Sequence, residues 1–109
     1  MAIDQKRLRR YEARARIAKA LAHPTRLLIL DELRHRERCV CELTDLAGAD
    51  QSTVSKHLAI LKQAGIVEDR KQGVQTFYCI KVCCLEGFWQ CIEGVLKENL
   101  RAQRAAIGR

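Results

Sequence analysis

The chain has 109 residues, 48% of them hydrophobic, so we expect residues 1–109 to form one domain and not a large enzyme scaffold such as an eight-stranded α/β barrel. Twenty lysines and arginines against thirteen acidic residues give a net charge of +7, which indicates a polyanionic partner. No stretch reaches the roughly 18 apolar residues of a membrane span, and no secretory signal is present. We therefore expect a cytoplasmic protein without a membrane partner.

Two helices are predicted at the start of the chain. Apolar side chains at three- and four-residue steps predict the first helix over residues 5–22. It ends before Pro24, because proline disfavours the α conformation at the residue before it. Pro24 begins the second helix, where its missing N–H costs nothing, and Leu27, Leu30 and Leu33 form the inner stripe of that helix.

The next two predicted helices form a helix-turn-helix pattern. A short helix over about residues 41–47 stops at Gly48, which adopts a positive φ readily. A three-residue turn leads to a helix over residues 51–64, with Asp50 as its N-cap and Gly65 at its end. Two helices joined by such a short, glycine-containing turn are typical of a DNA-binding unit.

The helix over residues 51–64 separates apolar from polar side chains. Val54, Leu58 and Leu61 share one stripe. The opposite face is small, polar and positive, and no acidic residue occurs from position 51 to position 67. Small side chains let a helix approach a groove, and hydroxyl and amide groups bond to phosphates or base edges. We therefore expect this recognition helix to lie in a groove of double-stranded DNA.

A β-hairpin is predicted next. Residues 66–70 and 74–82 are strand-like, and the basic sequence Lys71-Gln72-Gly73 joins them. A hairpin directly after a recognition helix is a wing. Its tip residues Arg70, Lys71 and Gln72 are expected to contact a phosphate or the minor groove.

The last predicted helix covers about residues 85–105. Its wide apolar stripe consists of Leu85, Phe88, Trp89, Ile92, Leu96 and Leu100. So small a monomer has little surface to cover this stripe, and we predict that the first and last helices pack against the same pair in a second subunit. A homodimer also places two recognition helices on two half-sites. The alternative is that both helices complete a core within one chain.

Taken in order, these elements predict a mainly α winged helix-turn-helix fold with the helix order α-α-α-α-β-β-α. The motifs resemble the ArsR/SmtB family of arsenical-resistance repressors over roughly residues 15–100. The resemblance rests on residues 20–26 (ALAHPTR), 39–43 (CVCEL) and 51–58 (QSTVSKHL). It implies a homodimeric repressor, not an enzyme, that leaves its operator when an inducer binds, and it implies that Ser55 and His57 lie at DNA-contacting positions. The expected DNA contacts are Gln51, Ser52, Thr53, Ser55, Lys56, His57, Lys62, Arg70, Lys71 and Gln72.

Six cysteines in a chain without an export signal indicate metal binding or redox chemistry. Cys39 and Cys41 resemble the thiol pair of the family branch that senses arsenite and antimonite, which implies As(III) or Sb(III) as inducer and no organic cofactor. Residues two apart in an ideal helix point about 200° from each other, so one ion bridges this pair only if Cys39 precedes the helix or the first turn distorts. Binding would then reshape the start of the helix that braces the recognition helix.

A third sulfur ligand is not evident nearby. Family members with three thiols in this segment carry the third where Thr44 stands here. The zinc-binding branch uses His, Asp and Glu on the last helix, but residues 85–105 contain no His and no Asp. The third ligand is therefore absent or comes from elsewhere, and an alternative site resembles another arsenic-binding arrangement of the family. Its candidate ligands are Cys83, Cys84 and Cys91.

Other functions remain open at this point. A thiol redox or persulfide sensor of the same fold would link Cys39 or Cys41 to Cys91. An enzyme with a cysteine nucleophile needs a base, and His35 near Cys39 is the only local pair. A winged-helix adaptor that binds protein is disfavoured by the basic wing and by the recognition helix without acidic residues.

Overall fold

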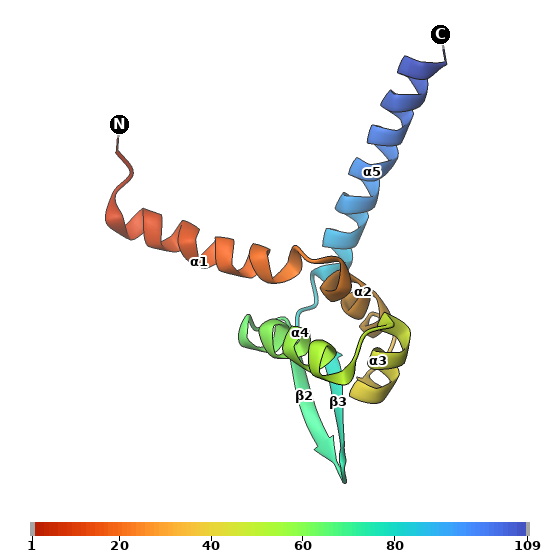
Figure 1. Cartoon of the computed structure of the whole chain (residues 1–109). Helices are drawn as coiled ribbons and strands as arrows, with labels where there is room; N and C mark the ends of the chain where they lie inside the picture. The colour runs from red at the N-terminus through yellow and green to blue at the C-terminus, as the bar shows by residue number, and fades with distance from the viewer. Residues whose placement is uncertain (1, 109) are drawn as a thin grey trace.

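The computed structural model describes residues 2–108 and confirms the mainly helical winged helix-turn-helix fold (Figure 1). The elements follow one another as α1 (Gln5–Leu21), α2 (Pro24–Leu33), β1 (Arg38–Cys39), α3 (Val40–Ala47), α4 (Gln51–Gln63), β2 (Val67–Gln72), β3 (Gln75–Ile80) and α5 (Leu85–Ile107). Helices α2, α3 and α4 pack with the sheet into a compact part, here called the head. Helices α1 and α5 project from it as two arms.

The core lies in the head. The predicted stripe of α4 is confirmed, since Val54, Leu58 and Leu61 are fully buried. Leu30 and Leu33 of α2 are buried as expected, together with Ile29, whereas Leu27 is only half-buried. The stripe of α2 is therefore rotated slightly from the predicted one, and it packs against Leu43 of α3 and the stripe of α4.

Local chemistry sets the helix ends at the expected positions. The Asp50 carboxylate caps α4 by accepting the N–H of Thr53 at 2.8 Å, and this bond lowers the pKa of the Asp50 carboxyl. Gly48 ends α3 with a φ of 64°, a left-handed conformation that side chains other than glycine adopt at a cost. Pro24 is the first residue of α2, as predicted.

The sheet has one more strand than the predicted hairpin. The two-residue strand β1 pairs antiparallel with β3, so the strand order is β1-β3-β2 and Cys39 lies opposite Phe77. The turn of the wing is also displaced from its predicted position. Gln72 pairs with Gln75, which leaves Gly73 and Val74 as the turn, with a φ of 63° at Gly73. The basic residues predicted at the tip thus belong to β2.

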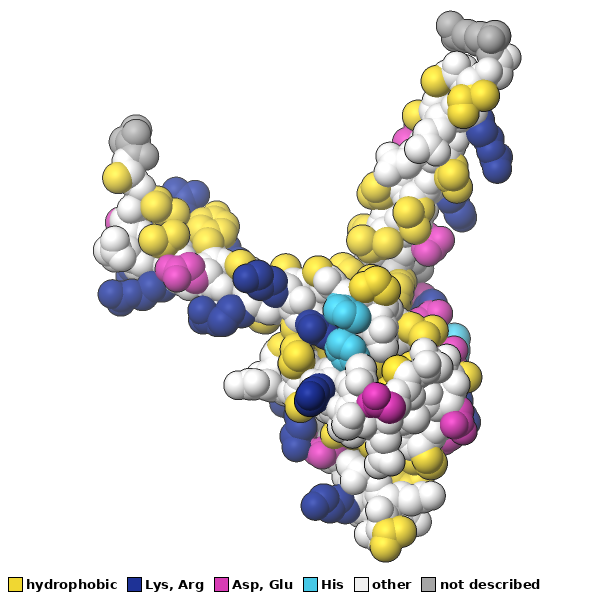
Figure 2. Space-filling model, in the orientation of Figure 1, with side chains coloured by type: hydrophobic (Ala, Val, Ile, Leu, Met, Phe, Trp, Pro, Cys, Tyr) yellow, Lys and Arg dark blue, Asp and Glu magenta, His cyan; other side chains and the backbone are white. Residues whose placement is uncertain are grey.

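The arms are too exposed to form a core within one chain. Beyond Trp89, every described residue of α5 is exposed, including Val95 (58%), Leu96 (50%) and Leu100 (52%). Figure 2 shows hydrophobic side chains along both arms, many of them facing the opening between the arms. The radius of gyration of 17.5 Å exceeds the about 13 Å of a compact chain of this length. Beyond their bases, the two helices therefore do not complete a core within one chain.

The base of α5 is fixed to the head. Leu85 is buried, and Phe88 and Trp89 pack on the core cluster. Arg34, at the end of α2, binds the carboxylate of Glu86 and lies over the Trp89 ring. Within residues 2–108, no helix is both long and apolar enough to cross a membrane.

Candidate nucleic-acid interface and thiol site

The outer face of α4 is accessible as the recognition helix requires. The side chains of Gln51, Ser52, Thr53, Ser55 and Lys56 are all exposed. These five predicted contacts lie on one helix whose opposite side is completely buried, so the helix cannot turn to present another face. The arrangement offers hydroxyl, amide and ammonium groups on a surface that a groove can receive.

Lys62 is placed differently from these residues. Its ammonium group forms an ion pair with the carboxylate of Asp69 on β2 at 3.0 Å. The hydrogen bond to Asp69 raises the pKa of the Lys62 side chain. Lys62 therefore links the end of α4 to the wing in this structure, and a phosphate contact requires it to leave Asp69.

His57 belongs to a cluster that the sequence did not indicate. The Arg26 Nε donates to His57 Nδ1 at 3.1 Å, and an Arg26 Nη1 donates to the carbonyl oxygens of Lys19 and Ala20 at the end of α1. The His23 ring lies 4.4 Å from the His57 ring, centroid to centroid. Burial, followed by the electrostatic effect of the neighbouring His23 and Arg26, lowers the pKa of His57. The cluster connects the recognition helix to the α1 arm. Because His57 Nδ1 accepts a hydrogen bond from Arg26, the neutral His57 ring carries its proton on Nε2.

The three predicted wing residues are exposed, but they differ in the partners of their side chains. Arg70 forms an ion pair with Glu37, donates to the side-chain oxygen of Gln72 at 2.7 Å and lies over the Phe77 ring. The hydrogen bond from Arg70 lowers the pKa of the Glu37 carboxyl. Lys71 is exposed and forms no salt bridge with any described residue. Lys71 is thus the cation of the wing most available to a phosphate.

Cys39 and Cys41 lie at the start of α3, and the structure joins them in a disulfide. Cys39 has extended backbone angles and is the N-cap of α3, so it precedes the helix as the sharing of one ion requires. Its sulfur accepts the N–H of Glu42 at 3.3 Å, and the Glu42 carboxylate accepts the N–H of Cys39 at 3.4 Å. Cys39 is 5% exposed, whereas Cys41 faces solvent.

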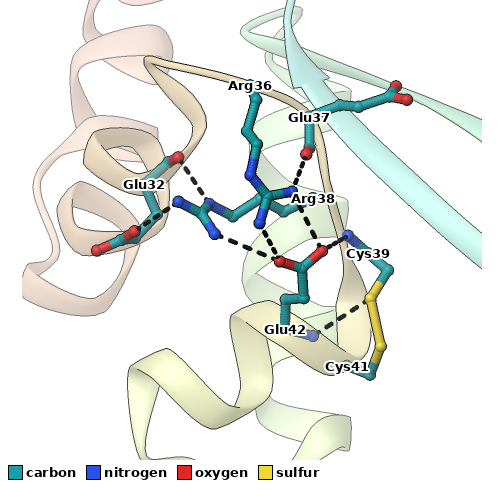
Figure 3. A network of polar contacts seen from close by, with 7 residues as sticks. All are labelled: Glu32, Arg36, Glu37, Arg38, Cys39, Cys41 and Glu42. Carbon is teal, nitrogen blue, oxygen red and sulfur yellow. Dashed lines mark hydrogen bonds and ion pairs between the residues drawn. A yellow bond between two sulfur atoms is a disulfide. The ribbon is translucent and has the colours of Figure 1, made fainter.

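A network of ion pairs surrounds this helix start (Figure 3). The Glu42 carboxylate binds Arg36 and Arg38, and the bond from Arg36 lowers the pKa of the Glu42 carboxyl. Arg38 also binds the carboxylate of Glu32 at 3.2 Å and the carbonyl oxygen of that residue at 2.9 Å. The helix that carries the thiols is in this way fastened to α2.

The other cysteines lie outside this site. Cys83, Cys84 and Cys91 are exposed free thiols near the base of α5, and half-buried Cys79 lies 3.7 Å from a carboxylate oxygen of Glu68. The pairing of Cys39 or Cys41 with Cys91 is not the one that forms. Within residues 2–108, no three His, Cys, Asp or Glu side chains lie close enough together to hold one metal ion.

The contact between Arg26 and His57 joins residues 31 positions apart, whereas the network around Glu42 lies entirely within residues 32–42. Of the residues in the His57 cluster, only His23 has a local sequence signal, because it stands at the capping position before Pro24. The His23 ring accepts the N–H of Thr25 at 3.1 Å. The remaining partners are set by how the helices pack.

Comparison with known proteins agrees with this geometry. The sequence pattern of the bacterial regulatory protein, arsR family, matches residues 23–69. An HTH-type transcriptional regulator of Methanocaldococcus jannaschii, MJ1325, is 47% identical over 74 residues, which are 67% of this chain and 83% of that protein. The transcriptional repressor SmtB of Mycobacterium tuberculosis is 42% identical over 67 residues, 62% of this chain and half of that protein.

A solved structure has the same fold over nearly the whole chain. The homodimeric winged helix-turn-helix DNA-binding domain Mb0332 of Mycobacterium bovis superimposes with a TM-score of 0.77 at 32% identity, and the match covers 94% of this chain and 95% of that one. Sequence and fold thus agree from the start of α2 to the wing. The chain belongs to the ArsR family of bacterial regulatory proteins, which bind DNA through a winged helix-turn-helix.

Proposed function

We propose that the chain is a homodimeric repressor that binds operator DNA through α4 and the wing, and that leaves the DNA when As(III) or Sb(III) binds Cys39 and Cys41. The observation that carries the proposal is the position of Cys39 at the N-cap of α3. There its sulfur and that of Cys41 reach each other, as their disulfide demonstrates. Two thiolates that converge in this way form a chelate for a soft, thiophilic ion.

The DNA contacts follow from the exposed face of α4 and from the basic wing. We assign direct contacts to the residues predicted from the sequence, with Lys56 and Lys71 as the phosphate-binding cations. The exposed apolar side chains of the arms support a dimer, because a monomer leaves them in water. The homodimeric domain from Mycobacterium bovis supports it independently.

Release of the DNA follows from what the thiol pair is attached to. Cys39 ends β1, which pairs with the wing strand β3, and it also caps α3, which packs against α4. A ligand that moves the Cys39 sulfur away from the N–H of Glu42 therefore acts on both DNA-binding elements. Binding of arsenite breaks two As–O bonds and two S–H bonds, forms two As–S bonds and releases two water molecules, and these As–S bonds then fix the position of the Cys39 sulfur.

The disulfide favours a second candidate, a redox-sensing repressor of the same fold. In this case two thiols release two protons and two electrons to an oxidant or a polysulfide and form the Cys39–Cys41 bond. The Cys39–Cys41 disulfide of the structure is the product of this reaction.

Titration of the reduced protein on an operator duplex, selected from random DNA, tests both candidates. We expect arsenite to release the wild-type protein, whereas Cys39→Ser/Cys41→Ser binds DNA equally well and ignores arsenite. Serine is a favourable N-cap, so this variant keeps α3 intact. A matched variant, Cys83→Ser/Cys84→Ser, responds normally. If arsenite has no effect and an oxidant releases the DNA, the redox candidate replaces the metalloid one; if only Cys83→Ser/Cys84→Ser loses the response, the site lies at α5.

A further inference from the structure

Arg26, in the first turn of α2, joins three helices through one side chain. Its Nη1 donates to the carbonyl oxygens of Lys19 at 3.3 Å and Ala20 at 3.1 Å, at the end of α1, and its Nε donates to His57 Nδ1 at 3.1 Å on α4. No carboxylate within residues 2–108 forms an ion pair with this guanidinium. The planar guanidinium fixes the directions of these bonds, so it also fixes the position of its acceptors relative to one another.

The His57 ring is confined on two sides. Two histidine side chains lie next to each other where the α1 arm meets the head, on the face of the molecule that Figure 2 shows. They are His23 and His57, and the His23 ring is itself held by the N–H of Thr25. With Arg26 at its Nδ1 and the His23 ring beside it, the His57 ring has little freedom to rotate.

The second nitrogen of His57 is available to a partner outside the chain. Nε2 carries the proton of the neutral ring, and burial together with the neighbouring His23 and Arg26 lowers the pKa of His57, which favours that neutral form. Within residues 2–108 no group accepts a hydrogen bond from Nε2, and Nε2 is not one of the buried polar atoms without a partner, so solvent reaches it. His57 therefore presents one N–H donor in a fixed direction.

His57 lies on a flank of α4, between the buried and the exposed face. It is about 60° around the helix axis from buried Val54, and it follows exposed Thr53 by one turn on the same flank. When a helix lies in the major groove, its outermost side faces the base edges and its flanks face the sugar-phosphate strands at the groove's borders. A donor on the flank is therefore suited to a phosphate oxygen.

We propose that Arg26 is a positioning residue for DNA binding, which orients His57 so that its Nε2–H donates to a phosphate oxygen beside the groove that α4 enters. This inference rests on the proposed function and adds to it a link between α4 and the α1 arm. A neutral donor fixes the register of α4 on the DNA backbone without releasing a counterion. Because Arg26 and His23 order the ring in advance, DNA binding does not have to order it.

A double-mutant cycle on an operator duplex selected from random DNA tests this role, at concentrations at which the protein is dimeric. His57→Phe keeps an aromatic ring without nitrogens, and Arg26→Met keeps an apolar chain without donors. A hydrogen bond to a charged group contributes about tenfold, and a dimer makes it twice, so His57→Phe should weaken binding about a hundredfold and Arg26→Met at least about tenfold. The double variant should bind no more weakly than His57→Phe, since Arg26 acts through His57. Losses that multiply, or an unchanged affinity for Arg26→Met, overturn the positioning role.

Salt dependence distinguishes positioning from a direct contact of Arg26 with DNA. Neither His57→Phe nor Arg26→Met should change the slope of log affinity against log salt concentration, because the proposed bond comes from a neutral group. A slope that becomes shallower by about 1.8 in Arg26→Met would mean that Arg26 itself binds a phosphate in each protomer, and it would overturn the proposal.

A second arginine of α2 provides a matched control. Arg34 stands at the other end of this helix and holds the α5 arm through Glu86 instead of binding a residue of α4. Arg34→Met is expected to bind the operator with wild-type affinity. If Arg34→Met and Arg26→Met weaken binding equally, the effect comes from the arms and not from His57.

Nitrogen-15 NMR of the imidazole rings tests the orientation of His57 in the free, full-length protein. At alkaline pH, where the ring is neutral, we expect a protonated Nε2 and an unprotonated, hydrogen-bonded Nδ1, with the His57 signals identified by their absence in His57→Phe. Arg26→Met should shift the Nδ1 signal and allow the tautomer protonated at Nδ1. A protonated Nδ1 in the wild type, or an Nδ1 signal that Arg26→Met leaves unshifted, refutes the inference.

The outcomes separate this inference from the proposed function. If the wild type binds its operator and His57→Phe binds equally well, the role of His57 and Arg26 is refuted and the repressor proposal stands. If the wild type binds no operator, both are refuted.

Discussion

The apolar side chains of α5 allow the dimer proposal to be tested with a single substitution. Leu96 lies in the middle of the arm and is 50% exposed. Full burial of a leucine side chain stabilises by about 1.5–3 kcal/mol, so covering half of it in each of two protomers contributes about the same amount to one dimer. Replacing Leu96 with alanine removes most of this term. Alanine has the highest helix propensity, so the arm itself remains helical.

Leu96→Ala is therefore expected to weaken the dimer about tenfold to a hundredfold. Sedimentation velocity over a concentration series measures this change, and DNA affinity at low protein concentration should fall with it. Val74→Ala is the matched control, because Val74 is fully exposed but lies on the wing, far along the chain from either arm. A dimer constant unchanged by Leu96→Ala, or lowered equally by Val74→Ala, refutes an interface through α5.

Three further predictions concern charge. Burial and the neighbouring His23 and Arg26 lower the pKa of His57, so the unfolded chain binds the proton more readily. The free energy of unfolding is therefore expected to decrease as the pH falls below about 6.5. Thermal unfolding measured over this pH range should show a smaller decrease for His57→Gln than for the wild type. Identical pH profiles for the two proteins would contradict this role of His57. In a dimer Lys56→Gln removes two phosphate contacts, so the negative slope of log affinity against log salt concentration should become shallower by about 1.8, while Lys97→Gln on the α5 arm leaves it unchanged. Equal slopes for Lys56→Gln and wild type would remove Lys56 from the phosphate contacts. Arg38→Met leaves Glu32 and Glu42 without their shared partner. It should lower the free energy of unfolding, measured with urea, by about 1–2 kcal/mol. An unchanged free energy of unfolding would show that the network does not stabilise the fold.

The helix ends and the inner face of α4 were predictable because each depends on a few neighbouring residues. Pro24, Gly48 and Asp50 act through their own backbone or through a bond three residues away, so the sequence carries the whole signal. The buried stripe of α4 follows from helical periodicity in the same way. The family motifs cover these same segments.

Contacts between distant segments were not predictable in this way. β1 consists of two residues and exists only because Arg38 and Cys39 pair with β3, almost forty positions later. The partner of Arg70 is Glu37, 33 residues earlier, and the partner of His57 is Arg26, 31 residues earlier. Such pairs carry no periodic pattern, because they depend on how the elements pack together.

The double role of Cys39 permits an estimate of how strongly the thiol site can influence DNA binding. Loss of an N-cap hydrogen bond costs about 0.5–2 kcal/mol, and a dimer has two such caps. If the bound inducer removes both and the DNA-bound form requires both, the coupling free energy is about 1–4 kcal/mol, which covers the range of 1–3 kcal/mol typical of allosteric proteins. This corresponds to a decrease in operator affinity of about fivefold or more. Under the proposed function, the sulfur of this one capping residue, held at the junction of β1 and α3, is thus placed to couple inducer binding to DNA affinity without a rearrangement of the core.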